Sequence, residues 1–183
     1  MIILSNKAKV LIITGKLDNK IGVIGDTNYL RKLGLGTYSE ALKLYLLDLA
    51  EIAYIMYKGL AKVKDSKGEI SLRDLFTKYS SSKVDWIKFT VLLDLRNRGR
   101  KAKAGFSPNS LIYEKGSSKV MVFVAEENSP LEAKQLIEWI DVAIKKGYEP
   151  VLAVVDAHGD VTYYSMLLLR PEDLKVKESE GRA

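Results

Sequence analysis

Few side chains of this sequence can exchange protons or bind a metal near neutral pH. The 183 residues include no cysteine and a single histidine, His158. A thiolate nucleophile, a cysteine-ligated zinc site and a disulfide are therefore excluded, and one chain cannot build a two-histidine relay. Asp156, His158 and Asp160 follow one another in a predicted tight turn, from which their side chains would splay outward. We therefore predict no metal site and no cofactor, and an exposed turn position for His158.

Positive charge is concentrated in one short segment. Lysine and arginine together number 29 against 23 acidic residues, and the formal net charge is +6. Five of the cations lie within residues 96–103, namely Arg96, Arg98, Arg100, Lys101 and Lys103. Such a cluster can contact the phosphates of a nucleic acid, releasing counterions. It can also be a solvated helix end, since cations suit a helix C-terminus. Both interpretations stay open at this point.

The Gly-Leu-Gly sequence at residues 34–36 could cradle a phosphate, but the pattern favours a plain turn. A third glycine is missing, and no Lys-Ser or Lys-Thr pair follows. Apolar residues recur at helical spacing from Leu42 to Met56. We therefore expect the turn to lead into one long helix, which the hydroxyl of Thr37 or Ser39 would cap.

The hydrophobic pattern elsewhere predicts alternating strands and helices. We expect strands before residue 25 and a short helix that begins with a capping box of Ser71 and Asp74. A serine-rich stretch at 80–83 is typical of a linker, and a third helix follows it. After that helix the pattern predicts two strands, a helix beginning at Ser129, and two more strands.

These elements predict an α/β (α+β) fold of two small domains. We place an N-terminal α/β domain at residues 1–80 and a C-terminal domain at 83–183, a mixed β-sheet flanked by helices. No apolar run reaches the roughly 20 residues that a membrane span requires. We therefore expect a soluble, cytoplasmic protein without a membrane partner. The lack of cysteine and the single glutamine favour a thermophilic source.

Several motifs in the second half occur in an order that resembles one enzyme family. They are LDLRNRGR at 93–100, Gly105-Phe106, LIYEKG at 111–116, LAVVD at 152–156 and GDVTYY at 159–164. Their order and spacing over residues 83–170 are similar to those of the archaeal tRNA-splicing (tRNA-intron) endonucleases, and the first 75 residues are similar more loosely. The resemblance implies a nuclease-type α/β fold. It also implies metal-independent cleavage of RNA, leaving a 2′,3′-cyclic phosphate.

In catalytic members of that family a tyrosine acts as base, a histidine as acid and a lysine as charge stabiliser. The resemblance places the tyrosine at Tyr113. The position of the histidine holds Ser117, whose hydroxyl has no proton to give near neutral pH. Where the lysine belongs, residues 148–151 read Tyr-Glu-Pro-Val. Lys145 and Lys146 lie upstream, at the predicted helix end, and would reach the site only through a register shift.

The resemblance therefore implies the structural, non-catalytic subunit of a heterotetramer that contains two such subunits and two catalytic paralogues. The assembly would cut precursor tRNA at bulge-helix-bulge sites, with the cations of residues 96–103 as candidate phosphate contacts. Family members dock an acidic loop onto the opposite subunit, and Asp156 and Asp160 match that loop. The last strand, predicted from Val161 to Leu169, resembles the family's dimer strand. We expect four of its residues at the interface, namely Tyr163, Tyr164, Met166 and Leu168.

Two other functions stay open. The chain could be an endonuclease that is active by itself, with Ser117 and either Lys145 or Lys146 in shifted roles. It could also be a stand-alone RNA-binding module. The sequence leaves open whether Tyr113 contacts RNA and whether the chain forms a homodimer by itself.

Overall fold

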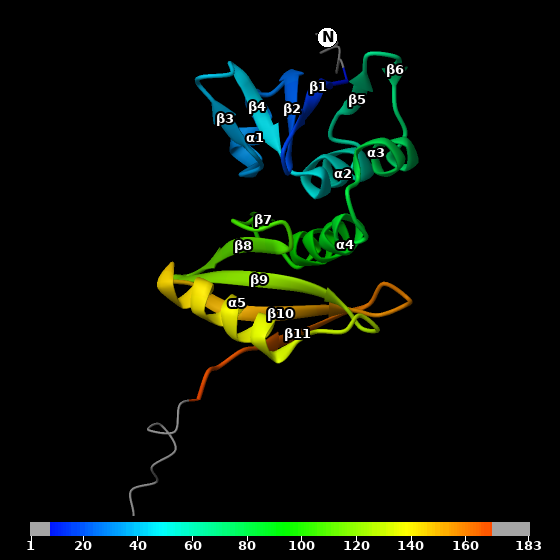
Figure 1. Ribbon diagram of the computed structural model, residues 1–183. Coiled ribbons are helices and arrows are strands. Elements are labelled where there is room, and N and C mark those ends of the chain that lie inside the picture. Colours follow the sequence, from blue (N-terminus) through cyan, green and yellow to red (C-terminus); the bar gives the residue numbers. More distant parts are fainter. Residues whose placement is uncertain (1–7, 170–183) are drawn as a thin grey trace, which may run out of the picture.

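Two β-sheets with helices between and beside them make up the protein (Figure 1), and the computed structural model describes residues 8–169. The first half contains β1 (Val10–Leu17), β2 (Lys20–Gly25), α1 (Asn28–Leu33), β3 (Thr37–Ser39), β4 (Leu44–Leu47), α2 (Leu49–Tyr57), β5 (Lys62–Asp65), β6 (Gly68–Glu69) and α3 (Leu72–Tyr79). The second half contains α4 (Val84–Asn97), β7 (Lys103–Ala104), β8 (Ser110–Lys115), β9 (Ser118–Glu126), α5 (Ala133–Lys145), β10 (Glu149–Val155) and β11 (Val161–Ser165). The predicted mixed α/β fold class is confirmed.

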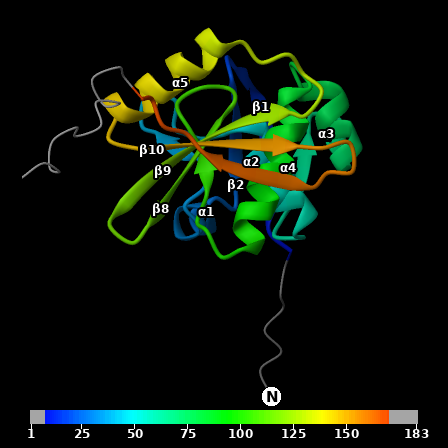
Figure 2. The ribbon, with the colours of Figure 1, turned by 90° about the horizontal axis from the view of Figure 1, so that it is seen from below.

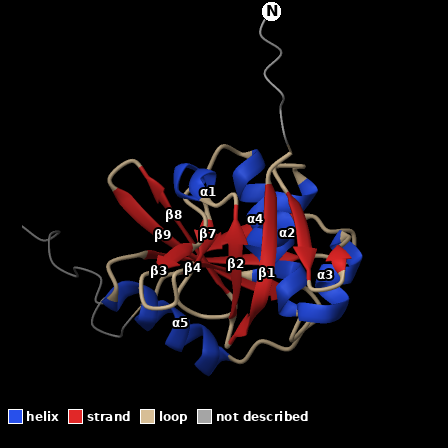
Figure 3. Cartoon of the chain, turned by 90° about the horizontal axis from the view of Figure 1, so that it is seen from above, coloured by secondary structure: helices blue, strands red, loops and turns tan. Residues whose placement is uncertain are grey.

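The two sheets share no strand. The first has the order β3-β4-β2-β1-β5-β6, and Figure 3 shows it from above. The second has the order β11-β10-β9-β8-β7. Its β9 and β10 are parallel and its other pairs antiparallel, so the sheet is mixed, as predicted. Figure 2 shows this sheet from below, with α5 running beside it. Within the described residues, none of the helices combines the length and apolarity needed to cross a membrane.

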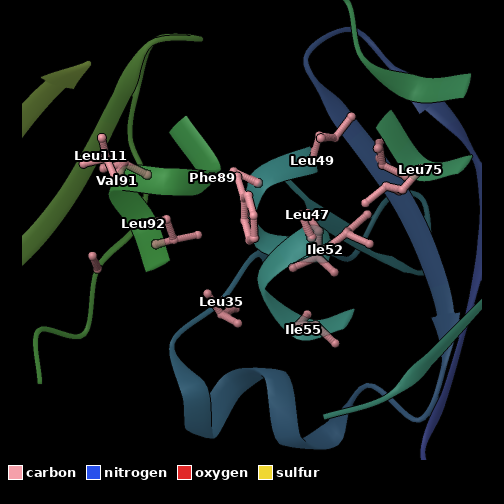
Figure 4. Packing of buried hydrophobic residues seen from close by; sticks show 14 of the residues in the cluster. Leu35, Leu47, Leu49, Ile52, Ile55, Leu75, Phe89, Val91, Leu92 and Leu111 are labelled. Atoms are coloured by element: carbon pink, nitrogen blue, oxygen red, sulfur yellow. The ribbon is translucent and has the colours of Figure 1, made fainter. Parts of the chain in front are cut away.

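One buried core continues from the first sheet through α4 to the second sheet. Figure 4 shows Val91 of α4 beside Leu111 of β8, while Phe89 of the same helix faces α2. These side chains are almost completely removed from water. The predicted boundary near residue 81 falls between α3 and α4. The division into two domains stays a prediction, since the hydrophobic cluster includes residues from both sheets.

The long helix predicted after residue 39 is wrong in its first half. Residues 37–39 and 44–47 form the antiparallel strands β3 and β4. The helix α2 begins only after Asp48, which caps it together with Glu51. A short apolar run is compatible with the period of a helix and with that of a strand. Residues 44–47 form a strand because they pair with β2. The sequence Asp-Leu-Ala-Glu at 48–51 is itself a capping-box signal that indicates the true start. The helix α1 before this region was also not predicted.

The Gly-Leu-Gly segment is a turn that separates α1 from β3. Gly34 takes a left-handed conformation (φ 65°) and ends α1. Gly36 (φ 63°) lies so close to β4 that a Cβ would be 2.7 Å from the carbonyl oxygen of Leu46. Glycine is therefore required here by a close backbone approach.

Two further boundaries differ from the prediction. The helix α5 begins at Ala133 rather than after Ser129, because Ser129 belongs to a turn in which its amide donates to the carbonyl of Glu126. The last strand ends at Ser165 instead of Leu169. The capping box of Ser71 and Asp74 is confirmed at the start of α3.

Candidate functional site

Tyr113 lies in a row of residues that crosses three strands of the second sheet. It is the register partner of Val120 in β9, which is in turn the partner of Glu149 in β10. The backbones of neighbouring strands are about 4.8 Å apart, so the Cα atoms of Tyr113 and Glu149, two strands apart, are separated by about 10 Å. The pairing of β9 with β10 is continuous from Glu149 to Val155. The start of β10 is therefore in ordinary register, and it contains most of residues 148–151, where the family resemblance places its lysine.

A hollow of about 590 Å³ opens beside Tyr113. We call it the first hollow. It is lined by Gly34, Gly99, Arg100, Lys101, Lys103, Ile112, Tyr113, Glu114, Gly116 and Tyr148. Three predicted phosphate contacts thus share one hollow with the predicted vestigial tyrosine. The guanidinium carbon of Arg100 is 5.9 Å from the centre of the Tyr113 ring.

Ser117 lines an adjoining hollow of about 520 Å³, the second hollow. Lys146 also lines it, whereas Lys145 is the last residue of α5. The ammonium of Lys146 lies 4.5 Å from the centre of the Phe106 ring. Neither lysine is among the residues that line the first hollow with Tyr113.

The only imidazole of the chain lies at the opposite end of β10. His158 is exposed in the turn between β10 and β11, as predicted. Six residue steps along β10 separate Glu149 from Val155, so this turn is about 20 Å from the row of Tyr113. The carboxylate of Asp156 organises the turn by accepting hydrogen bonds from the amides of His158 and Asp160. Those amides, that of Asp160 above all, hold the pKa of Asp156 below its ordinary value.

Arg96 and Arg98 are used differently from the three cations of the first hollow. The guanidinium of Arg96 donates to the carbonyls of Ala102 and Leu33, and so ties α4 to the end of α1. The Nε of Arg98 lies 2.7 Å from the carboxylate of Asp94 on the same helix. Both side chains therefore have intramolecular partners, and their predicted contact with RNA stays a prediction.

The strand β11 forms one edge of the second sheet. Of the predicted interface residues, Tyr164 is 53% exposed, whereas Met166 packs against the cluster under α5. Leu168 is half-buried and follows the strand. Tyr163 points to α4, where its hydroxyl donates to Asp94 at 2.7 Å. An unpaired strand edge can add a strand from another chain.

Tyr163 should make the protein sensitive to alkali. Burial, and secondly the hydrogen bond to Asp94, raise the pKa of Tyr163 well above its usual value of about 10. The neutral phenol therefore stabilises the folded state below pH ~10, and this contribution is lost as the pH rises further. Urea unfolding at pH 9 and pH 11 should show a steeper loss of stability in the wild type than in Tyr163→Phe. Equal losses in both proteins would contradict this role.

Sequence reasoning singled out Tyr113 and the cations but missed the aromatic residues that adjoin them. Tyr148 lines both hollows, and its ring meets that of Phe106 edge-on, with centres 5.7 Å apart. The only sequence signal for the position of Tyr148 was that this aromatic residue lies within residues 148–151, where the family resemblance places a lysine. No cluster of acidic residues and His158 that could hold a metal occurs within residues 8–169.

Comparisons with known proteins find similarity over most of this chain. Residues 86–163 match the family model of the tRNA intron endonuclease catalytic C-terminal domain. The chain is 32% identical over 168 residues to a tRNA-splicing endonuclease of Methanococcus vannielii, covering 86% of this chain and 95% of that relative. It is 30% identical over 169 residues to a tRNA-splicing endonuclease of Methanothermobacter thermautotrophicus, covering 87% and 99%. It is 35% identical over 129 residues to a tRNA-splicing endonuclease of Pyrococcus furiosus, covering 68% and 76%.

The match to one domain model alone defines a protein with an endonuclease-type C-terminal domain. The relatives extend the similarity over nearly the whole length of both chains. The chain therefore belongs to the tRNA-splicing endonuclease family, and the predicted family is confirmed.

Proposed function

We propose that this chain is the structural, non-catalytic subunit of an archaeal tRNA-splicing endonuclease. It pairs with a catalytic relative, two copies of each, and the assembly removes introns from precursor tRNA. One observation carries the proposal. The row of register partners that contains Tyr113 continues through Val120 to Glu149, and the turn that holds His158 is about 20 Å away from it. Residues 148–151, where the family resemblance places a lysine, read Tyr-Glu-Pro-Val and include no cation.

The chemistry of the family explains why this loss matters. When a ribose 2′-hydroxyl attacks the adjacent phosphate, one group must take its proton and another must protonate the leaving 5′-oxygen. Tyr113 could take part in one of these transfers, but the hydroxyl of Ser117 cannot supply the second proton near neutral pH. A positioned general acid or base contributes about 10²- to 10⁴-fold to the rate. Cleavage by this chain alone should therefore be slower than cleavage by a relative that retains the histidine, by at least about 10²-fold.

The rival function, cleavage by the chain alone, has one observation in its favour. Lys101 and Lys103 line the same hollow as Tyr113 and could stabilise negative charge on a phosphate. They would supply fixed positive charge, as the family lysine does, but neither of them stands at the position of the family histidine, which Ser117 occupies.

The decisive experiment compares this chain, a catalytic relative, and their mixture on a precursor tRNA with a bulge-helix-bulge. We expect no cleavage by this chain and efficient cleavage by the mixture. The Tyr113→Phe variant of this chain should support the same cleavage rate in the mixture as the wild type. As a positive control, loss of the matching tyrosine in the catalytic relative should abolish cleavage. Cleavage by this chain alone that Tyr113→Phe removes would refute the proposal.

The proposed assembly uses the turn between β10 and β11 and the edge of β11. The turn is held by the carboxylate of Asp156 and by backbone groups of Asp160, which leaves the side chain of Asp160 exposed. Opposite charge on a partner surface would orient docking through this side chain. Tyr164 on β11 supplies exposed apolar surface beside a strand edge that no other strand of residues 8–169 covers.

Asp160→Lys should weaken the complex with the catalytic relative by about tenfold or more, because like charges across an interface cost several kcal/mol. The fold should be unaffected, since the turn depends on the backbone of residue 160 and not on its side chain. Sizing chromatography at several concentrations measures the effect. Glu40→Lys, which reverses a charge on another exposed loop, in the first half, serves as the control. It also loses the exposed ion pair of Glu40 with Lys43, so circular dichroism checks its folding. An unchanged complex size for Asp160→Lys would reject this role for the turn.

A further inference from the structure

Tyr163 is the middle residue of β11, and its side chain and its backbone face different surroundings. The side chain points to α4, where its hydroxyl donates to Oδ2 of Asp94 at 2.7 Å. The backbone belongs to an edge of the second sheet, because β11 pairs with β10 and with no other strand of residues 8–169. The same residue therefore connects a helix to the strand edge that the proposed assembly uses.

The register of β10 and β11 shows which backbone groups of the edge strand face outward. The amide of Met166 donates to the carbonyl of Pro150, so these two residues form a hydrogen-bonded pair. Such pairs alternate along an antiparallel ladder, and steps of two from Met166 lead to Tyr164 and Thr162. The amides of these two residues therefore donate to β10. Tyr163 lies between them and directs its own amide and carbonyl away from β10, to the open edge.

Asp94 also binds a second donor. Its Oδ2 accepts from Nε of Arg98, one helical turn further along α4, at 2.7 Å. The guanidinium carbon of Arg98 is 5.7 Å from the centre of the Tyr163 ring, within the range of a cation–π contact. The three side chains thus form a closed network around a carboxylate that is only 26% exposed. Hydrogen bonds to a charged acceptor are stronger than those between neutral groups.

We propose that Asp94 is a positioning residue for subunit assembly, and that it acts through Tyr163 rather than through contact with a partner. The proposal rests on the proposed function. An edge strand that frays must be ordered before another strand can pair with it, and this ordering weakens binding. By holding the Tyr163 side chain against α4, Asp94 keeps the outward amide and carbonyl of Tyr163 aligned along the edge before a partner arrives.

The first test measures the affinity of the purified full chain for the catalytic relative by analytical ultracentrifugation. Asp94→Ala should weaken association by about tenfold, as for the loss of one hydrogen bond to a charged group. Tyr163→Phe keeps the ring but removes the donor, and it should have a similar effect. The two losses should not add in the double variant, because each removes the same hydrogen bond. Arg98→Gln leaves that bond in place and should have a smaller effect.

Hydrogen exchange measures the same effect in the unbound chain. The amides of Thr162 and Tyr164, which donate to β10, should exchange about tenfold faster in Asp94→Ala than in the wild type, because β11 opens locally more often. Asp94→Asn keeps a side-chain oxygen that can accept from the hydroxyl of Tyr163. It should therefore recover part of the loss in exchange protection and part of the loss in affinity.

Val63→Ala is the matched control for a general loss of stability. Val63 is 1% exposed in β5 of the first sheet, so its truncation should lower stability at least as much as the loss of one hydrogen bond. It should nevertheless bind the catalytic relative like the wild type and leave exchange at Thr162 and Tyr164 unchanged. Urea unfolding measures the stability of each variant, so that only folded chains are compared.

The proposal is overturned if Asp94→Ala associates like the wild type, or if Val63→Ala weakens association equally. It is also overturned if Asp94→Ala has its full effect in the Tyr163→Phe background. These outcomes are distinct from failure of the proposed function. A wild-type chain that associates no better than Asp94→Ala refutes only the positioning role, whereas a wild-type chain that does not associate at all refutes the structural-subunit role.

Discussion

Lys88→Met should lower the free energy of unfolding by about 3–5 kcal/mol. The ammonium of Lys88 lies 2.7 Å from Oδ2 of Asp48, and its side chain is only 1% exposed. Methionine fills a similar volume but leaves the Asp48 carboxylate buried without its main partner. Lys20 remains 3.8 Å from that carboxylate, which places the expected cost toward the lower end of the range. Urea unfolding monitored by circular dichroism measures the difference.

Two further variants distinguish the ion pair from the loss of a lysine as such. Lys83→Met, at an exposed position before α4, should change stability by about 0.5 kcal/mol or less. The double variant Lys88→Met with Asp48→Asn removes both charges and keeps a side-chain oxygen for the amide of Ala50. It should therefore be more stable than Lys88→Met alone. If Lys88→Met were as stable as Lys83→Met, the pair would not hold α2 against α4.

The position of this pair follows from the helix pattern only in hindsight. Lys88 stands four residues after Val84 and three before Val91, within the apolar stripe of α4, so its burial was readable from spacing. The identity of its partner, Asp48, could not be predicted in this way. Asp48 lies 40 residues earlier, in a segment interpreted as the middle of a helix, and caps a different helix. Tertiary pairing of this kind leaves no local trace in the sequence.

The second half of the chain was more predictable than the first. Long β-branched runs in β9 and β10 have one interpretation, and the β-β-α-β-β order is confirmed there. Between residues 37 and 47, short apolar segments fit helix and strand alike, and the pairing of β4 with β2 decides. The sequence alone identified Tyr113, and the cations that share its hollow, as candidate site residues. Their meeting with Tyr148 could not be predicted, because it depends on how the end of α5 turns into β10.

Glu51→Ala should destabilise the protein by about 3 kcal/mol or more. The Glu51 side chain is almost completely buried. Its Oε2 accepts from the amide of Asp48 at 2.9 Å, and its Oε1 accepts from the amides of Gly36 and Ala104 at 3.2 and 3.1 Å. Alanine leaves three amides without this acceptor, at about 1–3 kcal/mol for each donor that stays unsatisfied. Urea unfolding of the purified variant measures the loss.

Glu51→Gln is the matched control, because it keeps the shape of the side chain. Its carbonyl oxygen can still accept from the amides of Gly36 and Ala104, while its NH₂ group would face the amide of Asp48. We expect a stability between those of Glu51→Ala and the wild type. Equal stability of the two variants would show that the shared acceptor contributes nothing beyond the helix cap.

The same substitution should reach the first hollow through β7. Ala104 directly follows Lys103, and β7 pairs with β8 over these two residues only. The bond from Ala104 to Glu51 therefore anchors a short edge strand to α2, and with it the lysine that lines the first hollow. Hydrogen exchange of the Ala104 amide should be faster in Glu51→Ala than in Glu51→Gln, while amides in the middle of β9 exchange alike in both. Unchanged exchange at Ala104 would mean that β8 alone holds this strand in place.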